Sequence, residues 1–288
     1  WASEVFNCSA PDTGNMELLN LFATPAQRTE WLDPLLIGEI RSCFAMSEPD
    51  AASPDARNIR STIVRDGDSY VINGRKWFTT GALHPNCRLA IVMGVTGQNS
   101  EPGPLARHSM VLVPMNAPGL RIVRNIPIMN YHSPEGHCEL LFQNVRVPVS
   151  NLLGEEGEGF RLAQERLGPG RVHHCMRAIG QCEVALDLMC ERALERRAFG
   201  KHLAEFANIQ DWIAESRIEI DQARLLVLKA AHKMDREGNS AARVDVSAIK
   251  VVAARLQTRV VDRAMQVFGA MGLTPDTPLS YLWTWGRA

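Results

Sequence analysis

Three features that mark large classes of proteins are missing from this 288-residue sequence. Its 31 lysines and arginines balance 32 aspartates and glutamates, so the net charge of -1 attracts neither nucleic acid nor an anionic membrane. No apolar run approaches the roughly 18 residues that a membrane-spanning helix needs, and no signal-peptide pattern is present. The hydrophobic share of 45% instead predicts a globular protein with ample core, and the length favours two domains.

Cysteine pairs are missing as well, because the seven cysteines are odd in number and form no CxxC motif. Most of them lie in apolar runs, which indicates buried free thiols in a reducing compartment rather than disulfides. Histidines and cysteines gather at 132–138 and at 173–175 without the converging spacing of a zinc site, so we predict no metal.

The chain changes character twice along its length. Residues 1–40 contain short helices that we expect to break at Pro25 and Pro34, residues 41–150 carry many short strands, and residues 151–288 have helical periodicity. The sequence starts at Trp1 and stops directly after an apolar-aromatic stretch, so we also expect a fragment with both ends cut.

The strand-rich part favours an antiparallel barrel or sandwich. Its turn signals are Gly67-Asp68, which joins two alternating runs, and Asn73-Gly74, which predicts a second tight turn before RKWFTT.

The helical part has three long apolar stripes, which predict a bundle of long helices. The middle stripe is apolar over more than one face, which suggests contacts on several sides. Pro169 predicts a helix break or a helix start, and Arg196 to Lys201 read as a basic helix end followed by glycine.

Two stretches at strand ends are candidate ligand contacts. In CFAMSEPDAAS (43–53) an apolar run meets a turn of small residues that has two carboxylates and lacks the lysine and glycines of a phosphate loop. In KWFTTGA (76–82) two aromatics precede two hydroxyls, which suits a flat ring with a polar edge if the two stretches meet. Composition alone favours ordinary strand packing as the explanation.

Four motifs together resemble the acyl-CoA dehydrogenases: CFAMSEPDAAS, GRKWFTTGA, ALERRAFGK and QVFGAMG, in this order. The runs DTGNMELL and GPGRVHHCMRAIG are most similar to the branch called family members ten and eleven. The resemblance implies an α+β multidomain fold with an N-terminal helical remnant, a middle antiparallel β-barrel and a C-terminal long-helix bundle. It also implies flavin adenine dinucleotide (FAD) between barrel and bundle.

The resemblance assigns roles to residues of the first two motifs. Phe44, Met46 and Ser47 match contacts to the flavin ring, and Ser53 matches a serine near the flavin phosphates and the thioester ligand. Phe78 stands where the family usually has a tryptophan that shields the ring, which keeps a flat cover and loses an indole donor. The hydroxyls of Thr79 and Thr80 follow, Thr80 matching the one that bonds the ring's reactive nitrogen edge.

The later motifs match contacts to the cofactor of a neighbouring subunit, namely Arg196, Phe199, Gln266 and Gly269. A homodimer at least, or a homotetramer, is therefore expected. Arg171 matches an arginine near the substrate pocket.

The implied reaction is FAD-dependent α,β-dehydrogenation of acyl-CoA thioesters, a step of fatty acid β-oxidation that passes electrons to an electron-transfer flavoprotein. One family position for the catalytic carboxylate holds Gly170 here, and the other follows Ala288. We therefore expect no catalytic base within the chain, apart from Glu165 as a conceivable substitute, and little or no activity from these 288 residues alone.

Other readings stay open at this point. An acyl-CoA oxidase or a flavin monooxygenase would share the fold, and a non-catalytic flavoprotein or assembly module would have kept the fold without the chemistry. The expected compartment is the cytoplasm for a bacterial protein, and the mitochondrion or peroxisome for a eukaryotic one.

Overall fold

The computed structural model describes residues 5–52, 55–96 and 107–287. The chain divides into two compact units, Trp1–Leu167 and Gly168–Ala288. The long helix α5 (Gly159–Glu195) runs through the boundary. The domain limits at 40 and 150 stay predictions.

The first unit contains short helices followed by an eight-stranded sheet. Its helical segments are α2 (Asp12–Phe22), α3 (Pro25–Gln27), the π-helical η1 (Arg28–Leu32) and α4 (Asp33–Leu36). Its strands are β1 (Arg41–Ala45), β2 (Thr62–Asp66), β3 (Ser69–Thr80), β4 (Cys87–Thr96), β5 (His108–Pro114), β6 (Leu120–Asn125), β7 (His137–Pro148) and β8 (Leu152–Leu153).

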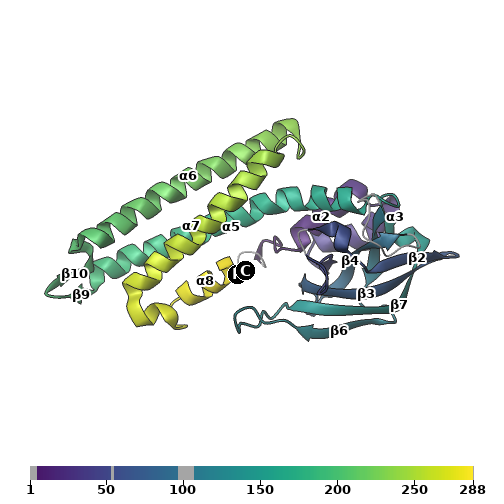
Figure 1. The fold of residues 1–288 in the computed structure, drawn as a ribbon, viewed down its shortest axis with the longest axis horizontal. Helices are drawn as coiled ribbons and strands as arrows, with labels where there is room; N and C mark the ends of the chain where they lie inside the picture. Colours follow the sequence, from purple (N-terminus) through teal and green to yellow (C-terminus); the bar gives the residue numbers. More distant parts are fainter. Residues whose placement is uncertain (1–4, 53–54, 97–106, 288) are drawn as a thin grey trace. The chain divides into compact units, whose positions relative to one another are not determined.

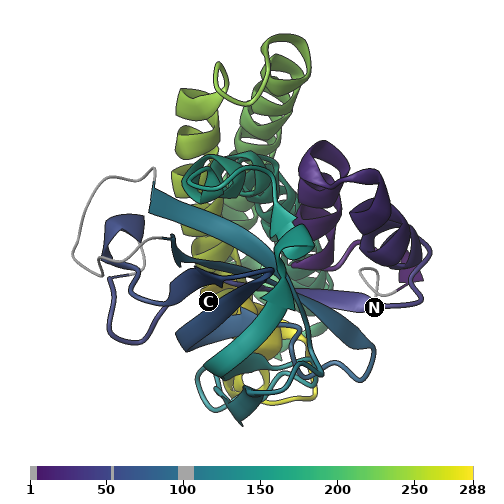
Figure 2. The same ribbon diagram turned by 90° about the vertical axis from the view of Figure 1, so that its right-hand side faces the viewer.

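The strands follow the order β6-β7-β3-β2-β4-β5-β8, with β1 also paired to β4. Most neighbours are antiparallel, as predicted, but β1 and β2 both pair with β4 in parallel. These two strands share one edge of β4: β1 pairs with residues between Cys87 and Val92, and β2 pairs with Val95 and Thr96. One apolar face of the sheet packs against α2 to α4, which lie beside the strands in Figure 2.

The predicted turn at Asn73-Gly74 is wrong, because β3 runs without interruption from Ser69 to Thr80. The glycine serves close packing instead. A Cβ at Gly74 would lie 2.1 Å from the Ser61 Oγ, so only glycine lets these two backbones approach. A register shift between Ile72 and Gly74 marks a bulge there.

Of the two prolines expected to break the N-terminal helices, only Pro25 does so, by starting α3 after a short gap. Pro34 lies within continuous helical structure, directly after η1. The π-helical turn widens the helix where the proline ring would otherwise meet a preceding carbonyl.

The second unit consists of α6 (Ala207–Glu237), α7 (Arg243–Phe268), the short α8 (Leu279–Arg287) and the rest of α5. Figure 1 shows the long helices running side by side, and their buried apolar stripes form one core, as predicted. The 3₁₀ segment η6 (Gly269–Leu273) links α7 to α8.

Two predictions about α5 are wrong. Pro169 lies inside the helix, because buried residues before it (Leu162) and after it (Cys175) hold the helix in place against the lost hydrogen bond. Helix α5 ends at Glu195 without the predicted glycine cap, because β9 (Arg197–Ala198) and β10 (Lys201–His202) form a hairpin directly after it. Its two loop residues, Phe199 and Gly200, both have positive φ, as a tight hairpin turn requires.

A charged network joins α5 to α6. Arg217 and Arg224 donate to the Glu183 carboxylate, with one Arg217 bond at 2.6 Å. The Arg217 bonds, joined by Arg224 and opposed by partial burial, lower the pKa of Glu183 to about 2.

We expect Glu183→Gln to lower the free energy of unfolding by about 1–2 kcal/mol at pH 7. The unfolded carboxyl titrates near pH ~4.3, so the native contribution is complete above that pH and is lost as the pH falls toward about 2. Urea unfolding of both proteins at pH 7 and pH 3 measures the difference. If the two proteins differ in free energy of unfolding by the same amount at pH 7 and pH 3, the ionic contribution of Glu183 is contradicted.

The seven cysteines are free thiols, five of them buried, as predicted. Within the described residues, no helix has the length and apolar character to cross a membrane.

Candidate functional site

The turn after β1 is tied to β3 by a buried ion pair. The Lys76 Nζ donates to the Glu48 carboxylate at 2.8 Å and to the Met46 carbonyl at 3.0 Å. The same carboxylate accepts the backbone N–H groups of Arg60 and Ser61 at 2.8 and 2.9 Å. Lys76 is 0% exposed and Glu48 is 5% exposed. The two stretches that the sequence suggested as ligand contacts therefore do lie together.

The pKa values agree with a charged pair. Burial tends to raise the pKa of Glu48, but Lys76, Ser61 and Arg60 hold that pKa below its ordinary value. Burial lowers the pKa of Lys76, and Glu48 opposes that shift. The acidic character of the turn is thus used inside the protein: Glu48 is engaged by Lys76 and by the backbone, and its carboxylate does not face a ligand.

A bulge in β3 redirects the two aromatic residues next to this turn. The ladder with β7 shifts register between Lys76 and Thr79, so Trp77 and Phe78 fall within the irregularity. The backbone N–H of Trp77 donates instead to the Ser47 carbonyl at 3.0 Å. Phe78 has φ 49° and is 45% exposed. A bulky side chain held at positive φ and turned outward is a feature typical of binding sites.

The two threonines that follow have different surroundings. The Thr80 hydroxyl lies 3.0 Å from the His137 Nδ1. The Thr79 hydroxyl is buried and, among the described residues, has no hydrogen-bond partner. An orphaned buried hydroxyl at the end of this strand is suited to bond a polar group of a ligand.

Phe44, at the end of β1, is covered on one face by Arg166 of α5, whose guanidinium carbon lies 4.0 Å from the ring centroid. The Arg166 Nε donates to the Asn15 amide oxygen at 2.8 Å. Gly14 lets the guanidinium come close, since a Cβ there would be 3.2 Å from the Arg166 side chain. The DTGN run therefore holds the arginine that supports Phe44.

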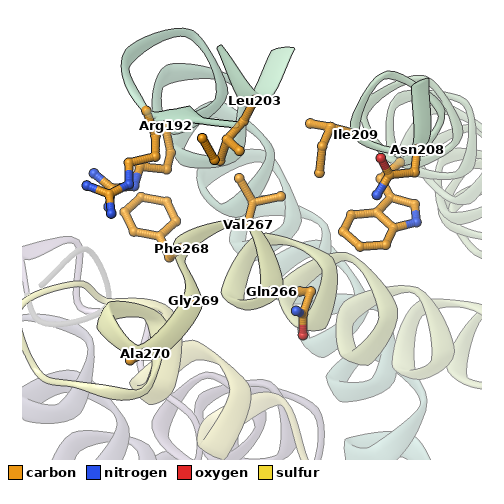
Figure 3. A pocket seen from close by; sticks show the side chains of 12 residues that line it. Arg192, Leu203, Asn208, Ile209, Gln266, Val267, Phe268, Gly269 and Ala270 are labelled. Carbon is orange, nitrogen blue, oxygen red and sulfur yellow. The ribbon is translucent and has the colours of Figure 1, made fainter. Parts of the chain in front are cut away.

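In the second unit, three of the predicted residues meet at one pocket of about 380 Å³ beside the hairpin. Arg196, Gln266 and Gly269 line it, and Figure 3 shows its walls. Phe199 is not among the lining residues; it stands at the hairpin tip, 98% exposed, with φ 50°.

Of the remaining predicted residues, two lie along α5 and two lie at the turn after β1. Arg171 and Glu165 lie half-buried along α5, and Met46 and Ser47 are half-buried at the turn. Ser53 lies outside the described residues. The described part of the chain holds no group of three His, Cys, Asp or Glu residues placed for a metal ion.

Three further residues belong to these places and were given no role from the sequence: Lys76, Arg166 and Arg192. A lysine inside an alternating strand, opposite an acidic turn, was the one available signal. The partners of Arg166 lie more than 150 positions away, at |i−j| of 151 and 155, which no local pattern can show.

Comparison with known proteins now places these features in a family. Residues 43–145 match the profile "Acyl-CoA dehydrogenase, middle domain", and residues 157–288 match "Acyl-CoA dehydrogenase, C-terminal domain". FadE2 of Mycobacterium tuberculosis, which is called a probable acyl-CoA dehydrogenase, is 57% identical over all of this chain and 70% of its own length. The chain belongs to the acyl-CoA dehydrogenase family.

Acyl-CoA dehydrogenase family member 11 of Gallus gallus is 52% identical over 100% of this chain, which confirms the resemblance to that branch. The chain spans only 37% of that relative's length. A solved Mycobacterium abscessus structure assigned to the acyl-CoA dehydrogenases matches with a TM-score of 0.96 and 50% identity, over 100% of this chain and 70% of that one. The α+β family fold is thereby confirmed, and membership supports an oxidoreductase and flavoprotein of acyl-CoA dehydrogenase type.

Phe78 offers a test in which stability and binding change in opposite directions. We expect Phe78→Gly to keep or raise the free energy of unfolding, by up to about 1 kcal/mol, because glycine adopts a positive φ without strain. The same change removes the exposed ring, so affinity for the FAD that the family resemblance implies should fall about tenfold. Urea unfolding and flavin-fluorescence titration give the two values, with Phe78→Trp as the variant expected to retain binding. Unchanged affinity in Phe78→Gly would exclude a ring contact.

Proposed function

We propose that this protein catalyses the FAD-dependent α,β-dehydrogenation of acyl-CoA thioesters. The observation that carries the proposal is the outward-facing Phe78 ring, held at positive φ beside a turn that the Lys76–Glu48 pair fixes in place. Strain and a buried charge pair are concentrated at the place that the family resemblance assigns to a flat cofactor ring.

The residues of the first unit fit a flavin. Phe78 supplies a flat apolar cover, and Phe44 and Met46 supply apolar contacts at the end of β1. The Thr79 hydroxyl, which has no hydrogen-bond partner among the described residues, and the Thr80 hydroxyl supply polar groups suited to the ring edge. Ser47 would contribute at the same edge, through its backbone or hydroxyl.

The pocket of the second unit fits the phosphate-bearing part of the FAD of a neighbouring subunit. Arg196 contributes a cation, Gln266 an amide, and Gly269 a backbone that a ligand can approach without a side chain in the way. The exposed Phe199 at the hairpin tip would reach the cofactor of a neighbouring subunit. In this proposal Arg171 and Ser53 contact the substrate.

A bound flavin would supply the acceptor for the hydride that leaves the substrate β-carbon. The protein's own tasks are to orient the thioester, to exclude water and to place a carboxylate at the α-proton. Gly170 has no side chain and cannot supply that carboxylate. The space beside it is open, because a Cβ added there would meet nothing within 4 Å. We therefore propose that the base is supplied by residues that follow Ala288.

The proposed partners are further copies of this chain and an electron-transfer flavoprotein, with the reaction forming a step of β-oxidation. The homo-oligomer is supported by large apolar side chains on the outer face of α6. Ile218 is 56% exposed, Leu225 66% and Leu228 51%, a stripe that a second helical surface would cover.

Anaerobic titration of the flavin-loaded protein with acyl-CoA thioesters tests the function. A chain extended by the residues that follow the matched region in FadE2 should lose its flavin absorbance band on substrate addition, whereas this chain alone should not. A flavin-loaded extended chain that no acyl-CoA bleaches would reject the dehydrogenase assignment. Rapid reoxidation in air with peroxide release would instead favour an oxidase.

A further inference from the structure

The pocket in the second unit contains a second arginine besides Arg196. Arg192 lies one helical turn earlier on α5 and lines the same pocket. Its guanidinium carbon is 5.3 Å from the centroid of the Phe268 ring, and Figure 3 shows the two groups next to each other. The ring therefore limits where the guanidinium can go, and the cation stays at the pocket.

Arg192 is partly buried, and its hydrogen bonding is incomplete within the part of the chain that the structure describes. Its Nε is buried and forms no hydrogen bond within the described residues. None of the twelve described residues that line the pocket is an aspartate or glutamate, and two of them are arginines. A buried donor and two positive charges without a carboxylate in the pocket wall are costly unless an anion completes the site.

The shape of the pocket suits a phosphate ester of an aromatic compound better than a simple carboxylate. Trp212 and Phe268 provide aromatic walls, Asn208 and Gln266 provide amides, and the volume of about 380 Å³ is within the range of small-molecule sites. Two guanidinium groups one turn apart at the end of a helix can contact neighbouring phosphate oxygens, which suits a diphosphate.

We propose that Arg192 is a second phosphate-binding residue, which acts beside Arg196 on the diphosphate of a dinucleotide. The inference rests on the proposed function, because FAD is the dinucleotide concerned. It adds a residue that none of the family motifs quoted above assigned a role, and it gives the orphaned Nε an acceptor.

The test compares FAD with riboflavin, which carries the same ring and no phosphate. Binding of each to the purified full chain is followed by quenching of flavin fluorescence. Arg192→Met should raise the Kd for FAD roughly ten- to hundredfold, the loss expected for one charge-assisted contact. Arg192→Lys should raise it less than about threefold, and riboflavin binding should change less than about twofold in both variants.

Arg197→Met is the matched control, because it removes a neighbouring cation that bonds Gly200 and His202 in the hairpin and does not line the pocket. Its FAD affinity should equal that of the unmodified chain. Equal FAD affinity in Arg192→Met, or an equal loss for FAD and riboflavin, would overturn the role of Arg192. If the unmodified chain binds FAD no better than riboflavin, the proposed dinucleotide function itself fails, whatever Arg192 does.

Discussion

Lys76→Met is expected to lower the free energy of unfolding of the first unit by about 3–5 kcal/mol. The substitution leaves Glu48 buried with only the backbone N–H groups of Arg60 and Ser61 as donors. It also takes away the donor to the Met46 carbonyl, so the turn after β1 is no longer held to β3 by this side chain. FAD affinity should fall with stability, because the two stretches that would contact the ring lose their link.

Replacing both Lys76 and Glu48 with neutral residues separates the cost of an unpaired buried charge from the loss of the link between the turn and β3. Lys76→Met combined with Glu48→Gln removes the unpaired charge and keeps one amide oxygen, which can accept from one of the two backbone N–H groups that now bond separate oxygens. We expect this double variant to regain more than half of the lost stability and little of the lost FAD affinity. Urea unfolding and flavin titration measure the two quantities.

Lys229→Met is the control for loss of a lysine from an ion pair. Its partner is Asp245 at 3.2 Å, but the Lys229 side chain is 69% exposed. Such a pair contributes at most about 1 kcal/mol. If Lys76→Met costs no more than this control, the buried pair does not hold the turn.

Gly74→Ala is expected to cost more than about 3 kcal/mol, a value at the upper end for overpacked substitutions. The new methyl group would lie 2.1 Å from the Ser61 Oγ and 2.8 Å from the Ser61 Cα. The Ser61 side chain can rotate away, but the clash with the main chain is relieved only if the backbone of Ser61 moves. That backbone also donates to the Glu48 carboxylate, so the movement would disturb the turn as well.

Gly67→Ala separates this clash from the ordinary cost of replacing a glycine at positive φ. Gly67 has φ 60°, and a Cβ there would meet nothing within 4 Å. This control should lose only about 1 kcal/mol. Thermal or urea unfolding of both variants gives the comparison, and equal losses would show that the approach of Ser61 to Gly74 is unimportant.

Local patterns predicted the elements whose causes are local. The Gly67-Asp68 hairpin and the end of β1 before Pro49 follow from turn residues and from proline chemistry. The three long helices follow from apolar positions repeated every three or four residues over many turns.

The same local signals failed where a distant segment supplied the competing force. Asn73-Gly74 has the composition of a turn, yet its glycine is there because Ser61 packs against it. Pro169 is a helix breaker in isolation, and buried residues on both sides carry α5 through it. The cations after Glu195 resemble a helix cap, and they belong to a hairpin whose loop holds Phe199 at positive φ.

The sequence by itself determined the class of protein, the order of helical and strand-rich parts and most of the residues proposed to contact the cofactor, because motif order and periodicity are properties of neighbouring residues. Only the tertiary structure showed which residues contact and support them: Lys76 bonds the acidic turn, Arg166 covers Phe44, and Arg192 lines the same pocket as Arg196. The physical reason is that a buried charge is tolerated only where a partner meets it in space, and that partner is set by packing rather than by distance along the chain.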